Sequence, residues 1–176
     1  DWDAHHGNGT ESVFYEDSSV LYTSIHQSPL YPGTGKVIDT GTGDGEGFTI
    51  NIPVPPGTGH DTYRGIFERI IIPAGKEFKP DAIVISAGQD SHAGDPLTDL
   101  ELCSGSYHMM TRMILEEISS QAIAVLEGGY NLDNLVKANY AIVCALRGEE
   151  SPFQVERRKE PKLAAKALGE AITVVK

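Results

Sequence analysis

Short apolar runs alternate with segments of helical periodicity along the chain. The apolar runs, expected to be strands, cover residues 20–26, 48–52, 81–86 and 121–126. The last two are almost wholly apolar, which is typical of parallel strands covered on both faces. Helical spacing of apolar residues marks 60–77, 105–119 and 132–147, and a further helix is expected over 161–171. This alternation predicts an α/β fold with a mainly parallel sheet flanked by helices.

Three local signals refine this picture. Pro73 should distort the helix over 60–77, because proline lacks the backbone N–H of a helix interior. Gly148 should end the helix over 132–147. The charged stretch VERRKEP precedes the last helix, so we expect residues 1–150 to form the main domain and 151–176 a charged linker with a C-terminal helix.

The chain opens with DWDAHHGNGT, which concentrates groups able to bind a metal ion. If this segment is extended, Asp1, Asp3 and His5 share one face, and His6 points away, toward a packed or hydrogen-bonded position. Crowded carboxylates are relieved by a cation, and an Asp/His donor set suits Zn, Fe, Mn or Co. The alternative is a frayed polar segment without a ligand. GNGT is expected to be an exit turn, with Thr10 as the N-cap of a helix over 11–16.

Polar residues also follow two of the predicted strands directly. DAIVIS leads into AGQDSHAGDP, which contains Asp90, and QAIAVL leads into EGGY, which contains Tyr130. Ligands bind beyond the carboxyl ends of strands in open α/β sheets, so these groups and the opening motif are expected to meet at one rim. Taken singly, Asp90 could be a helix N-cap and the Gly-Gly-Tyr stretch a turn with a packed ring.

Composition narrows the classes of partner and compartment. The formal net charge of −11 argues against nucleic acid as a direct partner and suits a cationic substrate, such as a lysine-rich tail or a polyamine. Cys103 and Cys144 are the only cysteines, which favours reduced thiols and a cytoplasmic location, or a nuclear one in a eukaryote. No apolar stretch approaches 18 residues, so no membrane span is expected.

The motifs DWDAHHGNGT, SAGQDSHAGDPL and EGGYNL resemble three signatures of the zinc-dependent histone deacetylase family, which includes bacterial deacetylase-like and acetylpolyamine amidohydrolases. SIHQSPLYPGTG and INIPVPPGTG resemble two supporting segments. Asn8 and Glu127 lean toward the class II and bacterial variants. The resemblance covers nearly all of residues 1–148, and it implies part of the arginase/deacetylase fold, with residues 1–150 as the C-terminal half of a catalytic domain.

The resemblance also implies roles for individual residues. Asp3, His5 and Asp90 match the three zinc ligands, a set that would also hold Fe(II) or Co(II). The hydroxyl of Tyr130 matches the donor to the substrate carbonyl, and Asp1 matches a carboxylate that orients a catalytic histidine. The residues that match the walls of an acetyl-lysine tunnel are Tyr31, Leu97 and Gly128.

Two structural potassium sites are implied in the same way. The first is made by Asp1, Asp3, His5, Ser24 and Ile25, the last two through backbone carbonyls. The second, weaker site is made by main-chain oxygens of Phe14, Asp17, Val20 and Phe48.

One part of the family pattern is not found. The resemblance implies a general base from two adjacent histidines upstream of the first zinc motif, whereas the only such pair here, His5-His6, belongs to the ligand motif. We therefore expect an incomplete catalytic domain that is weak or inactive alone and is complemented by an N-terminal half or by a second copy.

Three functions stay open at this point. The first is a metal-dependent amidohydrolase that removes acetyl groups from acetyl-lysine in proteins or from acetylpolyamines. The second is a catalytically silent, deacetylase-derived module that binds a metal or a partner. The third is an arginase-like manganese hydrolase, against which the single metal site and the Gly-Gly-Tyr stretch speak.

Overall fold

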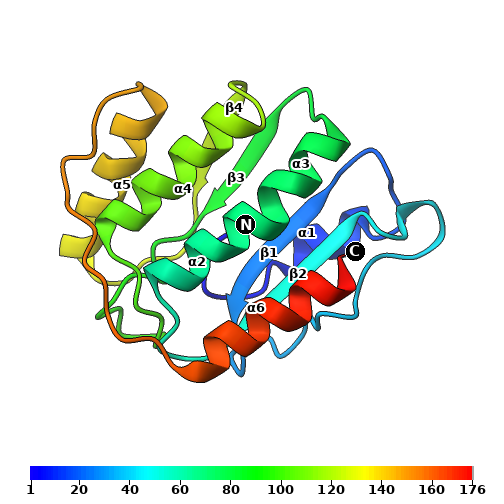
Figure 1. The fold of residues 1–176 in the computed structure, drawn as a ribbon, viewed down its shortest axis with the longest axis horizontal. Helices are drawn as coiled ribbons and strands as arrows, with labels where there is room; N and C mark the ends of the chain where they lie inside the picture. Colours follow the sequence, from blue (N-terminus) through cyan, green and yellow to red (C-terminus); the bar gives the residue numbers. More distant parts are fainter. Residues whose placement is uncertain (176) are drawn as a thin grey trace.

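The structure is a computed structural model and describes residues 1–175. Its elements, in chain order, are α1 (Asn8–Phe14), β1 (Tyr22–Gln27), the short 3-10 helix η1 (Gly43–Gly45), β2 (Thr49–Val54), α2 (His60–Ile66), the π-helical turn η2 (Phe67–Ile71), α3 (Ile72–Phe78), β3 (Ile83–Ala87), α4 (Ser104–Glu117), β4 (Ala122–Leu126), α5 (Leu132–Leu146) and α6 (Lys162–Val174) (Figure 1). The four predicted strands and the predicted α/β class are confirmed.

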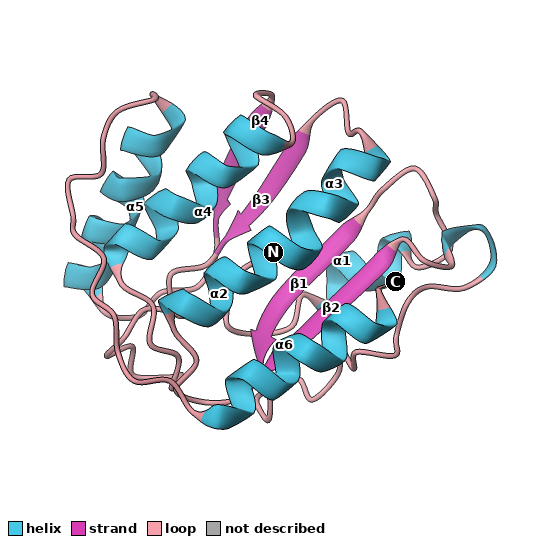
Figure 2. Ribbon diagram, in the orientation of Figure 1, coloured by secondary structure: helices cyan, strands magenta, loops and turns pink. Residues whose placement is uncertain are grey.

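All strand pairing is parallel, but the described strands form two separate pairs rather than the single sheet that we expected. β1 pairs with β2 from Tyr22 opposite Thr49, and β3 pairs with β4 from Ile83 opposite Ala122. Figure 2 shows the arrows of β1 and β3 pointing the same way, with a gap between them. The opening segment crosses one end of this gap, where the N–H of Trp2 donates to the carbonyl of Ser86 (3.2 Å).

A layer of helices covers one face of both strand pairs, with α2, α3, α4 and α6 in front of the strands in Figure 1. The largest buried side chains of the core, from several elements, are Trp2, Tyr63, Tyr107, Ile52, Ile66 and Ile70. The opposite face of β3 and β4 has little cover, since Val84 and Ile123 are 64% and 60% exposed. One face of this strand pair is therefore largely exposed.

Pro73 changes the helix over 60–77 as the sequence predicts. The path runs through α2, the wider turn η2 and α3, and Pro73 lies in the first turn of α3. A π-helical turn moves hydrogen bonds from i−4 to i−5, and proline has no N–H to offer an α-helical bond at this point. Lys79, with φ 55°, ends α3 in a left-handed conformation.

Helix α1 begins earlier than predicted. Its first residue is Asn8 and its N-cap is Gly7, so Thr10 lies inside the helix and does not cap it. The N–H of Glu11 donates to the carbonyl of Gly7 (3.0 Å), which closes the first turn. The GNGT stretch therefore forms the start of the helix, where we had expected an exit turn.

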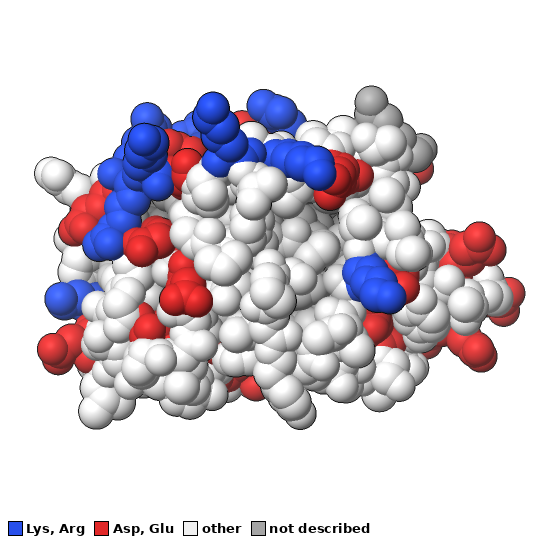
Figure 3. Space-filling model, turned by 90° about the horizontal axis from the view of Figure 1, so that it is seen from below, with Lys and Arg blue, Asp and Glu red and all other residues white. Residues whose placement is uncertain are grey.

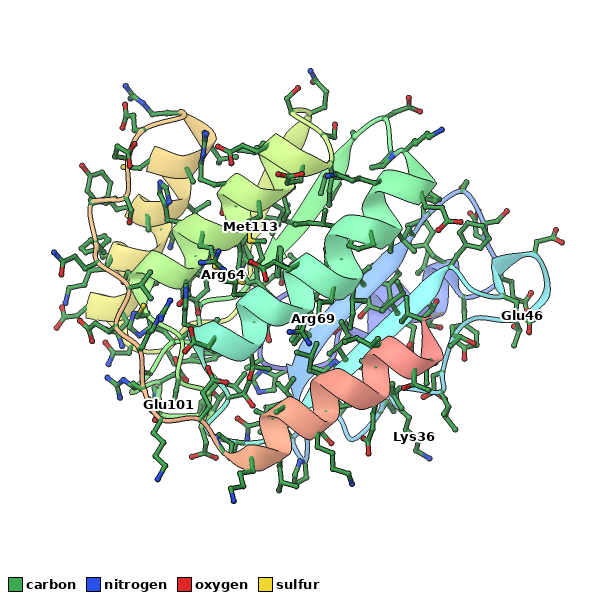
Figure 4. The ribbon with its side chains drawn as sticks, in the orientation of Figure 1. Lys36, Glu46, Arg64, Arg69, Glu101 and Met113 are labelled. Carbon is green, nitrogen blue, oxygen red and sulfur yellow. The ribbon has the colours of Figure 1, made fainter. Side chains whose placement is uncertain are left out.

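The C-terminal segment is bound to the domain. Helix α6 buries Ala164, Leu168 and Ala171, and the carboxylate of Glu160 accepts hydrogen bonds from the backbone N–H groups of Asp61 (2.8 Å) and Thr62 (3.2 Å). Arg158 forms an ion pair with Glu101 (2.7 Å), which Figure 4 labels beside this segment. The predicted linker therefore contacts the start of α2 and, through Glu101, the loop between β3 and α4. Within the described residues, no helix has the length and hydropathy needed to cross a membrane.

Candidate metal centre

The opening segment carries two candidate ligands on a well-anchored backbone. Trp2 and Ala4 are buried, whereas Asp3 and His5 are partly exposed, so the predicted alternation of faces is confirmed. The hydroxyl of Ser91 donates to the carbonyl of Trp2 (2.8 Å). The N–H of Gln27 donates to the carbonyl of Ala4 (2.8 Å). These contacts hold the segment against both strand pairs.

Asp90, which follows β3, completes a compact cluster. The Nδ1 atom of His5 lies 3.0 Å from Oδ1 of Asp3 and 2.9 Å from Oδ2 of Asp90. One ligand atom from each of these three residues lies within 4.8 Å of the others. The second oxygen of Asp90 accepts the N–H of Ala4 (2.8 Å). The structure therefore brings together the three residues that the resemblance gave as metal ligands.

The electrostatics of this cluster favour a cation. Burial, followed by the negative charge of Asp3, raises the pKa of Asp90 to about 7. Two carboxylates and one imidazole are a donor set that suits Zn and its first-row neighbours, and three protein ligands leave positions open for a reactant. A bound ion would stabilise the ionised form of both carboxylates. The residues present thus fit a catalytic metal.

Two glycines make room for the ligands. A Cβ on Gly128 would lie 2.6 Å from Oδ2 of Asp3, and a Cβ on Gly88 would lie 2.6 Å from the Cα of Asp3, closer than atoms can pack. The N–H of Gly128 also donates to Oδ2 of Asp3 (2.9 Å). Gly128, which we expected in a tunnel wall, therefore directly contacts Asp3 and Asp90, two of the candidate ligands. The sequence reasoning assigned no role to Gly88.

Tyr130 lies beside the cluster on a backbone held by a buried carboxylate. Its N–H donates to Oδ2 of Asp95 (2.8 Å), and the N–H of Leu97 donates to Oδ1 of the same residue (2.9 Å). The ring is 53% exposed. Desolvation, followed by the charges of Asp90, Asp3 and Asp95, raises the pKa of the phenol, so its hydroxyl remains a proton-bearing donor at neutral pH. The sequence did not predict a role for Asp95, although the Asp95-Pro96 pair indicates a turn after the Asp90 motif.

Asp1 lies outside the three-ligand cluster. Its Oδ1 accepts the N–H of Asp3 (3.0 Å), its amino group donates to the carbonyl of Thr23 (2.8 Å), and its carbonyl accepts the N–H of Ile25 (3.0 Å). Asp1 therefore lies beside Ser24 and Ile25 of β1, and the role of these residues toward potassium stays a prediction. In residues 1–175 its carboxylate makes no hydrogen bond to a histidine.

The other predicted site residues lie farther from the cluster. Tyr31, in the loop after β1, is 80% exposed and makes no hydrogen bond through its side chain within the described residues. At the second potassium site, the carbonyl of Phe14 accepts the N–H of Asp17 (3.1 Å) and that of Phe48 accepts the N–H of Tyr22 (2.9 Å). These carbonyls form turn and strand contacts, and their role toward an ion stays a prediction.

His6 points away from the cluster, as predicted. It is buried, and its Nδ1 pairs with the hydroxyl of Thr34 (2.8 Å). Its ring lies 4.7 Å from the ring of His26, which is also buried and bonded to Ser24 (2.9 Å) and to the carbonyl of Gly35 (2.9 Å). His26 therefore belongs, with His6, to a buried polar cluster behind the ligand segment.

The surface near the strand ends carries few charges at its centre. Figure 3 shows the molecule from below, the side toward which β1 and β2 point in Figure 2. Lys and Arg gather along one margin, acidic groups are scattered, and most of the central area is uncharged. The net negative charge is therefore not concentrated on this face.

Comparisons with known proteins agree with the geometry. The family model described as a histone deacetylase domain matches residues 1–146. A probable deacetylase of Archaeoglobus fulgidus is 47% identical over 167 residues, which cover 92% of this chain and 45% of that protein. A histone deacetylase-like amidohydrolase of Pseudomonas aeruginosa is 38% identical, over 86% of this chain and 41% of that protein.

Solved structures give the same result. The structure of the histone deacetylase Clr3 superimposes with a TM-score of 0.93 at 34% identity, covering 99% of this chain and 30% of that one. The HD domain of HDA15 gives a TM-score of 0.90 at 32% identity, covering 99% of this chain and 48% of that one. The chain spans less than half the length of these relatives. Since the histone deacetylase domain model matches residues 1–146 and the solved relatives share the fold, the chain belongs to the histone deacetylase family.

Proposed function

We propose that this chain supplies the metal-binding part of a zinc-dependent deacetylase that hydrolyses the acetyl amide of acetyl-lysine in proteins or of acetylpolyamines. The observation that carries the proposal is the cluster of Asp3, His5 and Asp90 beside Tyr130, with a fold shared with deacetylases. The manganese and arginase-like alternative has no specific support, because the described ligands form one three-residue group.

The residues have separate tasks in this proposal. Asp3, His5 and Asp90 would hold the metal, which when bound acts as a Lewis acid toward the amide carbonyl. The hydroxyl of Tyr130 would donate a hydrogen bond to the same carbonyl oxygen, where negative charge develops during attack by water. Asp95 fixes the backbone from which Tyr130 projects. The exposed side chains of Tyr31 and Leu97, with Gly128, would line the path of the aliphatic chain.

Proton transfer needs a further group. His5 is a metal ligand in this proposal, and His6 and His26 are buried among other partners. The other three histidines pair elsewhere, His60 with Ser106, His92 with Ser104 and His108 with the carbonyl of Glu149. Within residues 1–175, therefore, no unassigned histidine lies at the cluster to serve as general base. We propose that a complementary part of a deacetylase domain, in the same or another chain, supplies it, and that this chain alone turns over weakly or not at all.

Two further parts of the proposal concern ions and location. Structural K⁺ would be held near Asp1, Ser24 and Ile25, and the backbone hydrogen bonds of Asp1 with Thr23 and Ile25 support this proposal. The two cysteines are both buried and unpaired, which favours a reducing compartment such as the cytoplasm.

The test combines metal content with turnover. The 176-residue chain, and the same chain with deacetylase-family residues fused before Asp1, would be loaded with Zn²⁺ and assayed on an acetyl-lysine peptide and on an acetylpolyamine. Asp90→Asn is the inactivating variant, and Asp81→Asn, at an exposed position before β3, is the matched control. We expect both unmutated proteins to bind one Zn²⁺, turnover in the fused chain only, and loss of binding and turnover in Asp90→Asn.

A silent metal-binding module is the second candidate function, and the lack of an unassigned histidine at the cluster favours it for the isolated chain. Zn²⁺ binding without turnover in both chains would support this candidate. Failure of Zn²⁺ to bind either chain would overturn the proposed metal centre itself.

A further inference from the structure

Two separate parts of the chain carry the candidate ligands. Asp3 and His5 lie on the opening segment, whereas Asp90 lies in the loop after β3. Both carboxylates already bond to a neighbouring segment, since Asp90 accepts the N–H of Ala4 (2.8 Å) and Asp3 accepts the N–H of Gly128 (2.9 Å). The same carboxylates would have to hold the ion. A constant distance between the two parts therefore needs groups other than the ligands.

The hydroxyl of Ser91 is such a group. It donates to the carbonyl of Trp2 at 2.8 Å, across 89 positions of the chain. Ser91 directly follows Asp90, and Trp2 directly precedes Asp3, so this bond joins the two parts one residue away from a ligand on each side. Ser91 is fully buried and Trp2 is 2% exposed, so bulk water does not compete for the bond. Loss of the hydroxyl would leave a buried carbonyl without this donor.

The loop that carries Asp90 is held by further bonds. The hydroxyl of Thr98 donates to the carbonyl of Asp90, and the N–H of Leu102 donates to the carbonyl of Ser91 (3.1 Å). Neither bond involves the opening segment. Loss of the Ser91 hydroxyl should therefore leave this loop in place and weaken only its contact with the opening segment.

The opening segment has one other backbone bond to the β3 side. The N–H of Trp2 donates to the carbonyl of Ser86 at 3.2 Å, which is longer than the bond from Ser91. Ser86 precedes Asp90 by four residues, whereas Ser91 is its direct neighbour. The Ser91 bond therefore controls the position of the ligands more directly.

We propose that Ser91 is a positioning residue of the candidate metal centre, because its hydroxyl keeps the carboxylate of Asp3 close enough to Asp90 for both to share one ion. Ionised Asp3 and Asp90 repel each other, so the metal-free chain needs a contact that resists their separation. Ligands that are in place before an ion arrives bind it more tightly, because less ordering is needed on binding. The inference rests on the proposed function, in which Asp3, His5 and Asp90 hold the metal.

The first measurement is the affinity for Zn²⁺, by isothermal titration of the unmutated chain, Ser91→Ala and Thr111→Val. Thr111→Val is the matched control, because it also removes a buried hydroxyl that donates to a backbone carbonyl at 2.8 Å, but within helix α4. We expect the Kd of Ser91→Ala to rise about tenfold, and the Kd of Thr111→Val to remain that of the unmutated chain. An equal Kd in all three proteins would overturn the proposal.

The second measurement is amide hydrogen exchange in the presence of EDTA, which needs no metal. The amide of Ala4 bonds to Asp90, whereas the amide of Gln27 bonds the opening segment to the end of β1. In Ser91→Ala we expect exchange at Ala4 to become about tenfold faster relative to exchange at Gln27. Ser91→Cys, whose thiol is a weak donor in the same position, should have the same effect, which separates loss of the bond from loss of volume.

The outcomes distinguish this inference from the proposed function. Unchanged exchange at Ala4, or equal acceleration at Ala4 and Gln27, would overturn the role of Ser91, because a general loss of stability affects both amides alike. Failure of the unmutated chain to bind Zn²⁺ would overturn the proposed metal centre. Exchange in EDTA would then still decide whether Ser91 joins the two parts.

Discussion

The carboxylate of Asp95 joins the two loops that flank the candidate metal centre, because it accepts the backbone N–H of Tyr130 at 2.8 Å and that of Leu97 at 2.9 Å. A buried carboxylate with two amide donors is a strong positional restraint. In Asp95→Asn one oxygen is replaced by an NH₂ group that cannot accept. We expect a loss of about 2 kcal/mol in the free energy of unfolding and faster amide exchange at Tyr130, measured by urea titration and hydrogen exchange.

The matched control for this variant is Asp99→Asn, in the same loop at an exposed position. This variant should leave the free energy of unfolding and the amide exchange rate at Tyr130 nearly unchanged. If exchange at the Tyr130 amide were the same in Asp95→Asn and in the unmutated chain, Asp95 would not be what holds this loop.

Gly128→Ala is expected to abolish metal binding while the chain remains folded. The added Cβ would be 2.6 Å from Oδ2 of Asp3 and also too close to Asp90, so the carboxylates must move apart. Isothermal titration with Zn²⁺ or the visible spectrum of Co²⁺ would measure the loss. Gly9→Ala, in α1 with no neighbour within 4 Å of its Cβ, is the control and should bind metal normally. Normal binding in both variants would contradict the close packing around the ligands.

His26 should make the protein less stable in mild acid. Burial lowers its pKa to about 4, from an ordinary value near 6.5, with a smaller contribution from His6. Between these two values the unfolded chain binds a proton that the folded chain does not. The stabilisation is therefore complete above pH 6.5 and is lost as the pH falls toward 4, by a total on the order of 3 kcal/mol.

Urea titrations of the unmutated chain and of His26→Gln, at several pH values from 4 to 7, measure this contribution. The raised pKa of Asp90 acts in the opposite sense over nearly the same range, but it is present in both proteins. The difference between them thus isolates His26. Parallel stability curves for the two proteins would show that His26 does not titrate as described.

Asn131 caps helix α5 next to Tyr130. Its side-chain oxygen accepts the N–H of Asn134 (3.3 Å), and its amide nitrogen donates to the carbonyl of Gly94 (3.2 Å). Asn131→Ala should cost about 1 kcal/mol of stability. Asn131→Asp keeps the cap but not the bond to Gly94, so a stability close to that of the unmutated chain would assign the effect to the cap. A loss as large as that of the alanine variant would assign it to Gly94.

Periodicity was sufficient to predict most of the elements, because their burial follows the repeat of a strand or helix. The runs around Ile85 and Ile52 became β3 and β2, and the apolar stripe with Tyr107 and Met110 became α4. The start of α1 was wrong because the Gly7 to Gly9 stretch permits a turn and a helix start equally well. The separation of the strands into two pairs depends on which strands are neighbours in space. The order of strands and helices along the chain does not contain this information.

The candidate ligands were predictable because each belongs to a recognisable motif. Asp3 and His5 alternate along one extended segment, and Asp90 directly follows a strand, so all three are expected at the same edge of the sheet. Asp95 and Gly88 could not be predicted in this way. The donors to Asp95 lie 2 and 35 residues away along the chain, and Gly88 matters through a backbone that approaches it from Asp3. Such contacts exist only once the segments are placed in space.

The segment from Asp1 to Ala4 has a consequence for how an ion would act. It is bonded to β1 through Thr23 and Ile25 and to β3 through Ser86, and it carries Asp3, whereas Asp90 belongs to the β3 side alone. An ion shared by Asp3 and Asp90 would cross-link these two parts of the molecule. Ion affinity and the distance between the strand pairs are then thermodynamically linked. A change that restrains this distance should increase the affinity for the ion, and a bound ion should in turn stabilise the strand pairs against separation.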